Sequence, residues 1–111
     1  MEITEQSKGA VRVFKPRGPL CQADADLLKR TVTEASGASM GRVVVDASAI
    51  PYVDSRGLEV LVELSEDMAE SGQTLKVCGA NETLREVFDL TDIAGLFEHY
   101  EDVNSAVRSF L

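Results

Sequence analysis

The run Val43-Val44-Val45 is the part of this sequence that most restricts the possible fold. Successive side chains of a strand point to opposite faces of a sheet, so a strand with three β-branched residues in a row needs cover on both faces. Strands of this kind are typical of partly parallel sheets with helices packed against them. We therefore expect residues 43–45 to form the central strand of an α/β domain.

Strand-like and helix-like patterns alternate around this run. Alternation typical of strands occurs over residues 2–5, 10–15, 74–78 and 96–100. Apolar residues recur at helical spacing over residues 22–36, 55–71, 82–91 and 103–110. This order predicts one domain over residues 1–111, with a mixed, mostly parallel sheet and right-handed crossover helices against it.

Turn residues mark where these segments end. Residues 7–9 predict a hairpin turn, Pro16 predicts a break after the second strand, and residues 37–41 form a loop of small residues. Asn81 and Asp102 are expected to cap the third and fourth helices, because short polar side chains accept hydrogen bonds from the amides of a first turn. Gly72 is expected to stop the second helix.

The charge of the chain excludes several classes of partner. The sequence has 19 acidic and 11 basic residues, a formal net charge of −8 over 111 residues. Such a surface repels phosphate backbones and anionic lipid, so we expect no nucleic-acid partner and no membrane insertion. No apolar run approaches the ~18 residues of a spanning helix, and the first residues are acidic where a signal peptide is basic. These features predict a cytoplasmic protein.

Motifs for catalysis or cofactor binding are missing from the sequence. Neither GxxxxGK[ST] nor GxGxxG occurs, and His99 is the only histidine, in an expected edge strand. Cys21 and Cys78 form no CxxC motif, and we expect both to be reduced, buried and inert. A small acid–base enzyme would need paired groups that the sequence does not offer. We expect no enzyme activity, no catalytic residue, no cofactor and no metal site.

Polar residues gather on both sides of the link between the central strand and the next helix. Asp46 and Ser48 follow the strand, and Asp54 and Ser55 precede the helix, so both pairs should lie at one edge of the sheet. Ser55 has two interpretations that its position alone does not separate. It caps the helix, alone or with Asp54, or it is a phosphorylation target whose phosphate the first-turn amides would favour.

The same link resembles the signature of STAS domains, in particular of bacterial anti-sigma factor antagonists. The pattern is Asp-x-Ser-x-hydrophobic-x-x-hydrophobic-Asp-Ser-x-Gly-Leu, carried by Asp46, Ser48, Ile50, Val53, Asp54, Ser55, Gly57 and Leu58. The resemblance implies that Ser55 is phosphorylated by a partner that is both an anti-sigma factor and a serine kinase. It further implies that the unphosphorylated form binds this partner and frees the sigma factor, and that a phosphatase restores binding. A weak homodimer is left open.

The other expected partner-binding residues are Asp54, Arg56, Gly57, Asp46 and Ser48. Asp54 would orient the serine or meet a cation of the kinase, and Gly57 would allow a partner or a loop to pack close to the helix start. For Asp46 and Ser48 we favour hydrogen bonds to loop amides over direct partner contact.

Two positions depart from the antagonist pattern. Cys21 stands where many antagonists carry an aspartate beside the phosphorylated serine, and Arg56 stands where a small residue is usual. Arg56 could pair with a phosphate on Ser55 or with Asp54. These departures keep an alternative open: a non-switching STAS module, such as an accessory subunit of a phospholipid-transport ABC system or a signalling scaffold, in which Ser55 is only a cap.

Overall fold

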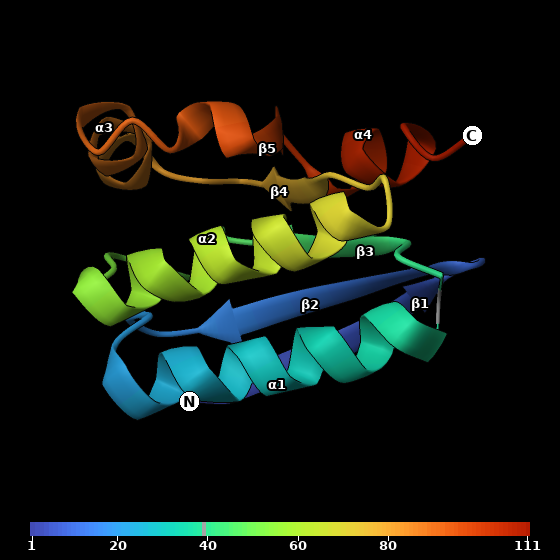
Figure 1. Cartoon of the computed structure of the whole chain (residues 1–111), viewed down its shortest axis with the longest axis horizontal. Helices are drawn as coiled ribbons and strands as arrows, with labels where there is room; N and C mark the ends of the chain where they lie inside the picture. Colours follow the sequence, from blue (N-terminus) through green and yellow to red (C-terminus); the bar gives the residue numbers. More distant parts are fainter. Residues whose placement is uncertain (39) are drawn as a thin grey trace.

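The computed structural model describes residues 1–38 and 40–111 and has the predicted α/β architecture. A five-stranded sheet has the order β1-β2-β3-β4-β5, with β1 antiparallel to β2 and the other neighbours parallel (Figure 1). The strands are β1 (Glu2–Lys8), β2 (Val11–Arg17), β3 (Val43–Asp46), β4 (Leu75–Cys78) and β5 (Phe97–Tyr100). The expected mixed, mostly parallel sheet with residues 43–45 at its centre is confirmed.

Helices cover both faces of this sheet. They are α1 (Gln22–Ala38), α2 (Ser55–Glu70), α3 (Glu82–Leu90) and α4 (Val103–Arg108), with a short 3-10 turn, η1 (Ala94–Leu96), before β5. The helices α1 and α2 run side by side in the same direction across one face (Figure 1). Val43 and Val45 pack into the core on that side, whereas Val44 packs with Ala106 of α4 on the other. The central valines are therefore covered on both faces, as predicted.

The predicted helix ends are also present. Asn81 accepts a hydrogen bond from the Leu84 amide at the start of α3, and Asp102 accepts one from the Ser105 amide at the start of α4, each at 2.8 Å. Helix α2 ends at Glu70, and Gly72 follows with a φ of +73°, a backbone conformation that glycine adopts without strain.

The first hairpin differs from the prediction in its register. β1 extends to Lys8, which pairs with Val11, so the turn consists of Gly9 and Ala10 and not of residues 7–9. Two-residue turns match the twist of a hairpin, and Gly9 supplies the positive φ, +64°, that such a turn requires. The longer β1 was hidden because most of its side chains are exposed and give little apolar alternation.

Strand β2 runs through Pro16, which we expected to end it. The Arg12 and Gly18 amides both donate toward the β3 side, to the carbonyls of Arg42 and Ala49. The backbone nitrogen of Pro16 faces the same side. The pairing of β2 with β3 ends at Phe14, however, so the N–H that Pro16 lacks removes no hydrogen bond between the two strands. Helix α1 also continues to Ala38, into the expected 37–41 loop; Ser39 of that loop lies outside the described residues.

Candidate functional site

Ser55 is the first residue of α2, at the carboxyl-end edge of the sheet. The N-cap of α2 is Asp54, whose Oδ1 accepts a hydrogen bond of 2.8 Å from the Gly57 amide. The interpretation of Ser55 as the cap is therefore wrong: the hydroxyl one position later makes no hydrogen bond within the part of the chain that the structure describes. Ser55 is exposed, so its oxygen is free and open to solvent.

Asp54 holds two helix starts together. While Oδ1 caps α2, Oδ2 accepts a hydrogen bond of 3.1 Å from the backbone amide of Gln22, the first residue of α1. The Asp54 amide donates to the Leu20 carbonyl, and the Leu20 amide donates to the Tyr52 carbonyl. The chain just before Ser55 is thus joined along its backbone to the segment that links β2 with α1.

Gly57 is needed for this close contact. It is buried, and a Cβ atom built on it would lie 2.2 Å from the carbonyl oxygen of Leu20 and 3.2 Å from the Cβ of Val53. We expected Gly57 to allow the close approach of a partner or of a loop. The structure shows the close approach of a loop. The glycine lets the β2–α1 link lie against the first turn of α2.

Asp46 and Ser48 lie at the same edge of the sheet but beside a different loop. Asp46 is buried, and its Oδ1 accepts a hydrogen bond of 3.0 Å from the Ser48 amide, which is the loop-amide bond we favoured. A Cβ atom on Gly79, just after β4, would lie 3.0 Å from the Cβ of Ser48. This pair therefore borders the β4–α3 link, whereas Asp54 and Ser55 border the β2–α1 link. Of these four side chains, those of Ser48 and Ser55 are exposed.

The loop between the two pairs carries a residue that the sequence analysis missed. Tyr52 is 52% exposed, although aromatic side chains are usually buried. Its loop is fixed from both sides, because Leu20 bonds the Tyr52 carbonyl and the Asn81 side chain donates to the carbonyls of Ile50 and Pro51 at 3.3 Å each. The sequence did contain a signal for an exposed Tyr52. It is a large aromatic residue three positions before Ser55, in a stretch without helical spacing.

Arg56 does not contact Asp54, contrary to one of our expectations. Its Nη2 lies 2.6 Å from Oδ1 of Asp26 on α1, and its Nη1 lies 3.1 Å from Glu59 and 2.9 Å from Glu63 on α2. The hydrogen bond to Asp26 is the main reason why the pKa of Arg56 is raised. The guanidinium therefore joins α1 to α2 and is surrounded by carboxylates.

Cys21 lies beside the Asp54 segment, since its neighbours Leu20 and Gln22 both bond to Asp54. It is half-buried, and not fully buried as we expected, whereas Cys78 is fully buried. Burial, and then the carboxylate of Asp46, raise the pKa of the Cys78 thiol to about 12. Both cysteines are free thiols.

In residues 1–38 and 40–111, no three or more His, Cys, Asp or Glu side chains gather so that they could hold a metal ion. None of the helices that the structure describes is long and apolar enough to cross a membrane.

The comparisons with known proteins agree on one family. A profile of the STAS domain matches residues 2–106. A curated relative, BtrV of Bordetella bronchiseptica, provisionally named an anti-sigma factor antagonist, is 22% identical over 110 residues, which are 99% of this chain and 95% of the relative. A Thermotoga maritima protein given the same provisional description superposes with a TM-score of 0.87 at 20% identity, over 96% of this chain and 92% of the other.

Two further solved structures share the fold. The Bacillus protein SpoIIAA in its phosphorylated form superposes with a TM-score of 0.74 at 11% identity, over 99% of this chain and all of the other. A sulfate transporter family protein from Wolinella succinogenes superposes with a TM-score of 0.77 at 17% identity, over 90% of this chain and 84% of the other. At these identities the structures establish a shared fold, which occurs both in antagonists and in transporters.

Proposed function

The chain belongs to the STAS domain family, and from that premise we propose that it is an anti-sigma factor antagonist controlled by phosphorylation of Ser55. Unphosphorylated, it binds a cytoplasmic partner that is both an anti-sigma factor and a serine kinase, and so frees a sigma factor. The kinase phosphorylates Ser55 and ends binding, and a phosphatase restores it. The protein itself is a binding module and a substrate, and not an enzyme.

The observation that carries this proposal is the state of the Ser55 hydroxyl. A kinase needs a hydroxyl that can reach a γ-phosphate, and Ser55 is exposed and unbonded within the described residues. Both oxygens of the adjacent Asp54 are engaged with backbone amides. The carboxylate therefore fixes the backbone beside the hydroxyl and leaves the hydroxyl itself free to react.

A phosphate on Ser55 would change the surface more than the fold. The first-turn amides and the dipole of the 16-residue α2 favour an added charge of about −1.5 to −2. The nearest cation in sequence, Arg56, is bound to Asp26, Glu59 and Glu63, so these carboxylates compete with the phosphate for it. Most of the new charge would face a docking partner, and every ~1.4 kcal/mol lost from the interface weakens binding tenfold.

The test joins intact-mass analysis of the protein from its native cells with a pull-down by four forms of it: wild type, Ser55→Ala, Ser55→Asp and Ser48→Ala. Ser48 is the matched control, an exposed serine at the same edge. We expect one phosphate, mapped to Ser55, and a kinase-type partner that is held by Ser55→Ala and Ser48→Ala and lost by Ser55→Asp. An unmodified Ser55 with a partner set that none of the variants alters would contradict the proposal.

A constitutive STAS module is the second candidate. The fold that this chain shares with a transporter family protein favours this candidate. Cys21 also favours it, because antagonists often have an acidic residue at this position beside Asp54, and a free cysteine brings no charge there. In that case the same edge is a permanent interface of a transporter or a signalling scaffold. The pull-down would then recover such a partner equally with wild type and with Ser55→Asp.

A further inference from the structure

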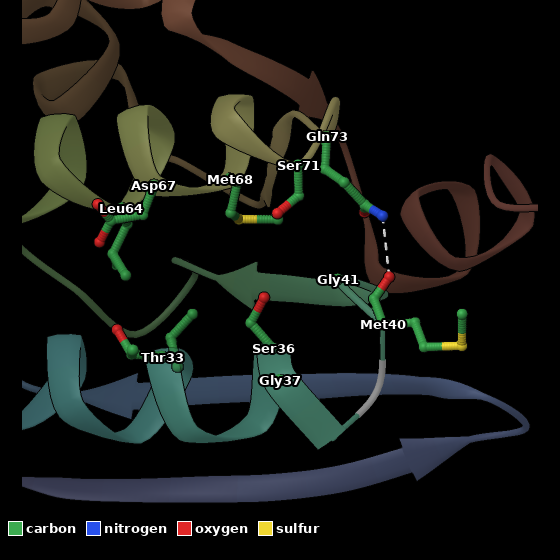
Figure 2. Close-up of a pocket in the computed structure, with 11 residues that line it drawn as sticks. Thr33, Ser36, Gly37, Met40, Gly41, Leu64, Asp67, Met68, Ser71 and Gln73 are labelled. Carbon is green, nitrogen blue, oxygen red and sulfur yellow. Dashed lines mark hydrogen bonds between the residues drawn. The ribbon is translucent and has the colours of Figure 1, made fainter.

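A cavity of about 550 Å³ opens between the C-terminal halves of α1 and α2 (Figure 2). Ser55 lies at the other end of α2. Its apolar part is formed by Val32 of α1 and by Leu64 and Met68 of α2, all of them buried. This volume is within the range of small-molecule sites, about 300–1,000 Å³. The Ser55 site takes no part in the cavity.

Polar groups surround the apolar part of the cavity. In Figure 2 the Thr33 and Ser36 side chains rise from α1 and Ser71 descends from α2 toward the space between the helices, and Asp67 lies beside Leu64 on α2. The end of the cavity is closed by Gln73, whose Nε2 donates a hydrogen bond of 2.9 Å to the Met40 carbonyl. Hydroxyl groups, the Asp67 carboxylate and the Gln73 carboxamide are thus the polar side-chain groups of the lining.

The electrostatic character of the cavity is negative. Asp67 is the only charged residue among those that line it in the described chain, and no lining residue is basic. The helices α1 and α2 run in the same direction, so both place their C-terminal ends here, where a helix carries roughly half a negative charge. Neither helix has a basic residue in its last turn to offset that charge.

The backbone bonds that close these helix ends leave the negative potential in place. The Ser36 carbonyl accepts from the Gly41 amide, and the Met68 carbonyl accepts from the Gln73 amide, each at 2.9 Å. Amides satisfy the hydrogen-bonding capacity of the carbonyls without bringing a positive charge. A cationic group bound between the helix ends would supply the missing charge.

We propose that this cavity binds a small organic ammonium ion with an apolar body. The apolar body would cover Val32, Leu64 and Met68, and the ammonium group would lie near Asp67 and the helix ends and donate to hydroxyl oxygens. A carboxylate of the same shape would meet Asp67 and the two helix termini with the wrong sign. The inference is independent of Ser55 and of its phosphorylation.

The test is an NMR titration of the ¹⁵N-labelled protein with three probes of equal shape: hexylammonium, hexanol and hexanoate. We expect saturable shifts of the amides of Thr33, Ser36, Asp67 and Gln73 with hexylammonium, weaker shifts with hexanol and weakest with hexanoate. Equal binding of hexanoate and hexylammonium, or shifts that never saturate or lie elsewhere, would overturn the proposal.

Two variants separate the cavity carboxylate from the general charge of α2. Asp67→Asn should weaken hexylammonium binding about two- to fivefold, the effect of one surface ion pair, and leave hexanol binding unchanged. Glu66→Gln removes the same charge from the neighbouring exposed residue, which does not line the cavity, and should leave both affinities unchanged. Equal losses in the two variants would show that only net charge matters and would contradict a site at Asp67.

Discussion

The backbone amide of Gln22 donates a hydrogen bond of 3.1 Å to Oδ2 of Asp54, across 32 residues of sequence. The other oxygen of the same carboxylate caps α2 through the Gly57 amide. One side chain therefore sets the position of the first turn of both helices on this face of the sheet. Because Ser55 follows Asp54 directly, its hydroxyl lies at a junction fixed from two directions.

Replacing Asp54 should destabilise the fold through both of its bonds. We expect Asp54→Ala to lower the free energy of unfolding by about 1–2 kcal/mol, because an N-cap and a long-range hydrogen bond are lost together. Asp54→Asn keeps one acceptor oxygen and should cost less. Urea unfolding followed by circular dichroism measures both changes. A loss in Asp54→Ala no larger than that in Asp102→Ala, which removes the cap of the six-residue α4 alone, would contradict the double role.

Gly57→Ala should destabilise the protein although it places a better helix former in α2. The added methyl group would meet the Leu20 carbonyl at 2.2 Å, and moving that backbone should cost about 1–3 kcal/mol. Gly37→Ala is the matched control, because Gly37 is also helical and nothing lies within 4 Å of its Cβ position. That variant should be neutral or gain up to about 1 kcal/mol. Thermal unfolding of the two variants compares them directly, and a stable Gly57→Ala would show that the contact is not tight.

Acid should weaken the contact between β4 and β5. Oε1 of Glu98 accepts hydrogen bonds from the Tyr100 hydroxyl at 2.6 Å and from Lys76 at 3.1 Å, and these contacts lower its pKa below the usual 4.5. A depressed folded-state pKa gives stability that is present above pH 4.5 and is lost as the pH falls through the lower, folded value.

Urea unfolding between pH 7 and pH 3 tests this dependence. In Glu98→Gln the loss of stability below pH 4.5 should be smaller than in the wild type, because the titrating group is gone. Glu101→Gln is the control, since Glu101 is exposed and makes no ion pair or hydrogen bond in the described chain. Identical acid profiles of the wild type and Glu98→Gln would show that Glu98 contributes nothing.

Local chemistry explains which parts of the fold could be predicted from the sequence. The caps Asn81 and Asp102 could be identified because each precedes apolar residues at helical spacing, and the hydrogen bond they make is local. The central valines were equally clear, since three β-branched residues in a row are typical of a strand that is covered on both faces. By contrast, exposed β1 gave little apolar alternation, and the turn after it was predicted at residues 7–9, too early in the chain.

The contacts of the site depend on packing that a sequence pattern does not contain. Arg56 was expected to pair with a phosphate on Ser55 or with Asp54, but the contact between α1 and α2 brings Asp26, 30 residues earlier, within 2.6 Å of it. The second bond of Asp54, to Gln22, depends on the same contact. The residues of the edge can be recognised in the sequence, but their tertiary contacts decide which of them are fixed and which are left free.

The two thiols should differ sharply in reactivity. Cys21 is partly exposed, whereas Cys78 is fully buried and its pKa is raised to about 12, so almost none of it is thiolate at pH 8. We expect iodoacetamide at pH 8 to add one group to the native protein, at Cys21, and a second only after denaturation. Intact mass and peptide mapping measure this, and Cys21→Ser should show no fast labelling. Rapid labelling of native Cys78 would show that β4 opens readily.

Tyr52 should contribute to partner binding without contributing to stability. Tyr52 is 52% exposed, while its loop is fixed by bonds from Leu20 and Asn81, so binding would order little additional chain. Exposed aromatic residues on such rigid surfaces are common hot spots. We expect Tyr52→Ala to weaken binding of the kinase-type partner at least tenfold, about 1.4 kcal/mol, and to change the free energy of unfolding by less than about 0.5 kcal/mol.

Leu111→Ala, which truncates another exposed apolar side chain at the other end of the molecule, is the control (Figure 1). Titration calorimetry with the partner recovered by pull-down, together with urea unfolding, separates the two effects. Wild-type affinity in Tyr52→Ala would restrict the docking surface to the two helix starts joined by Asp54.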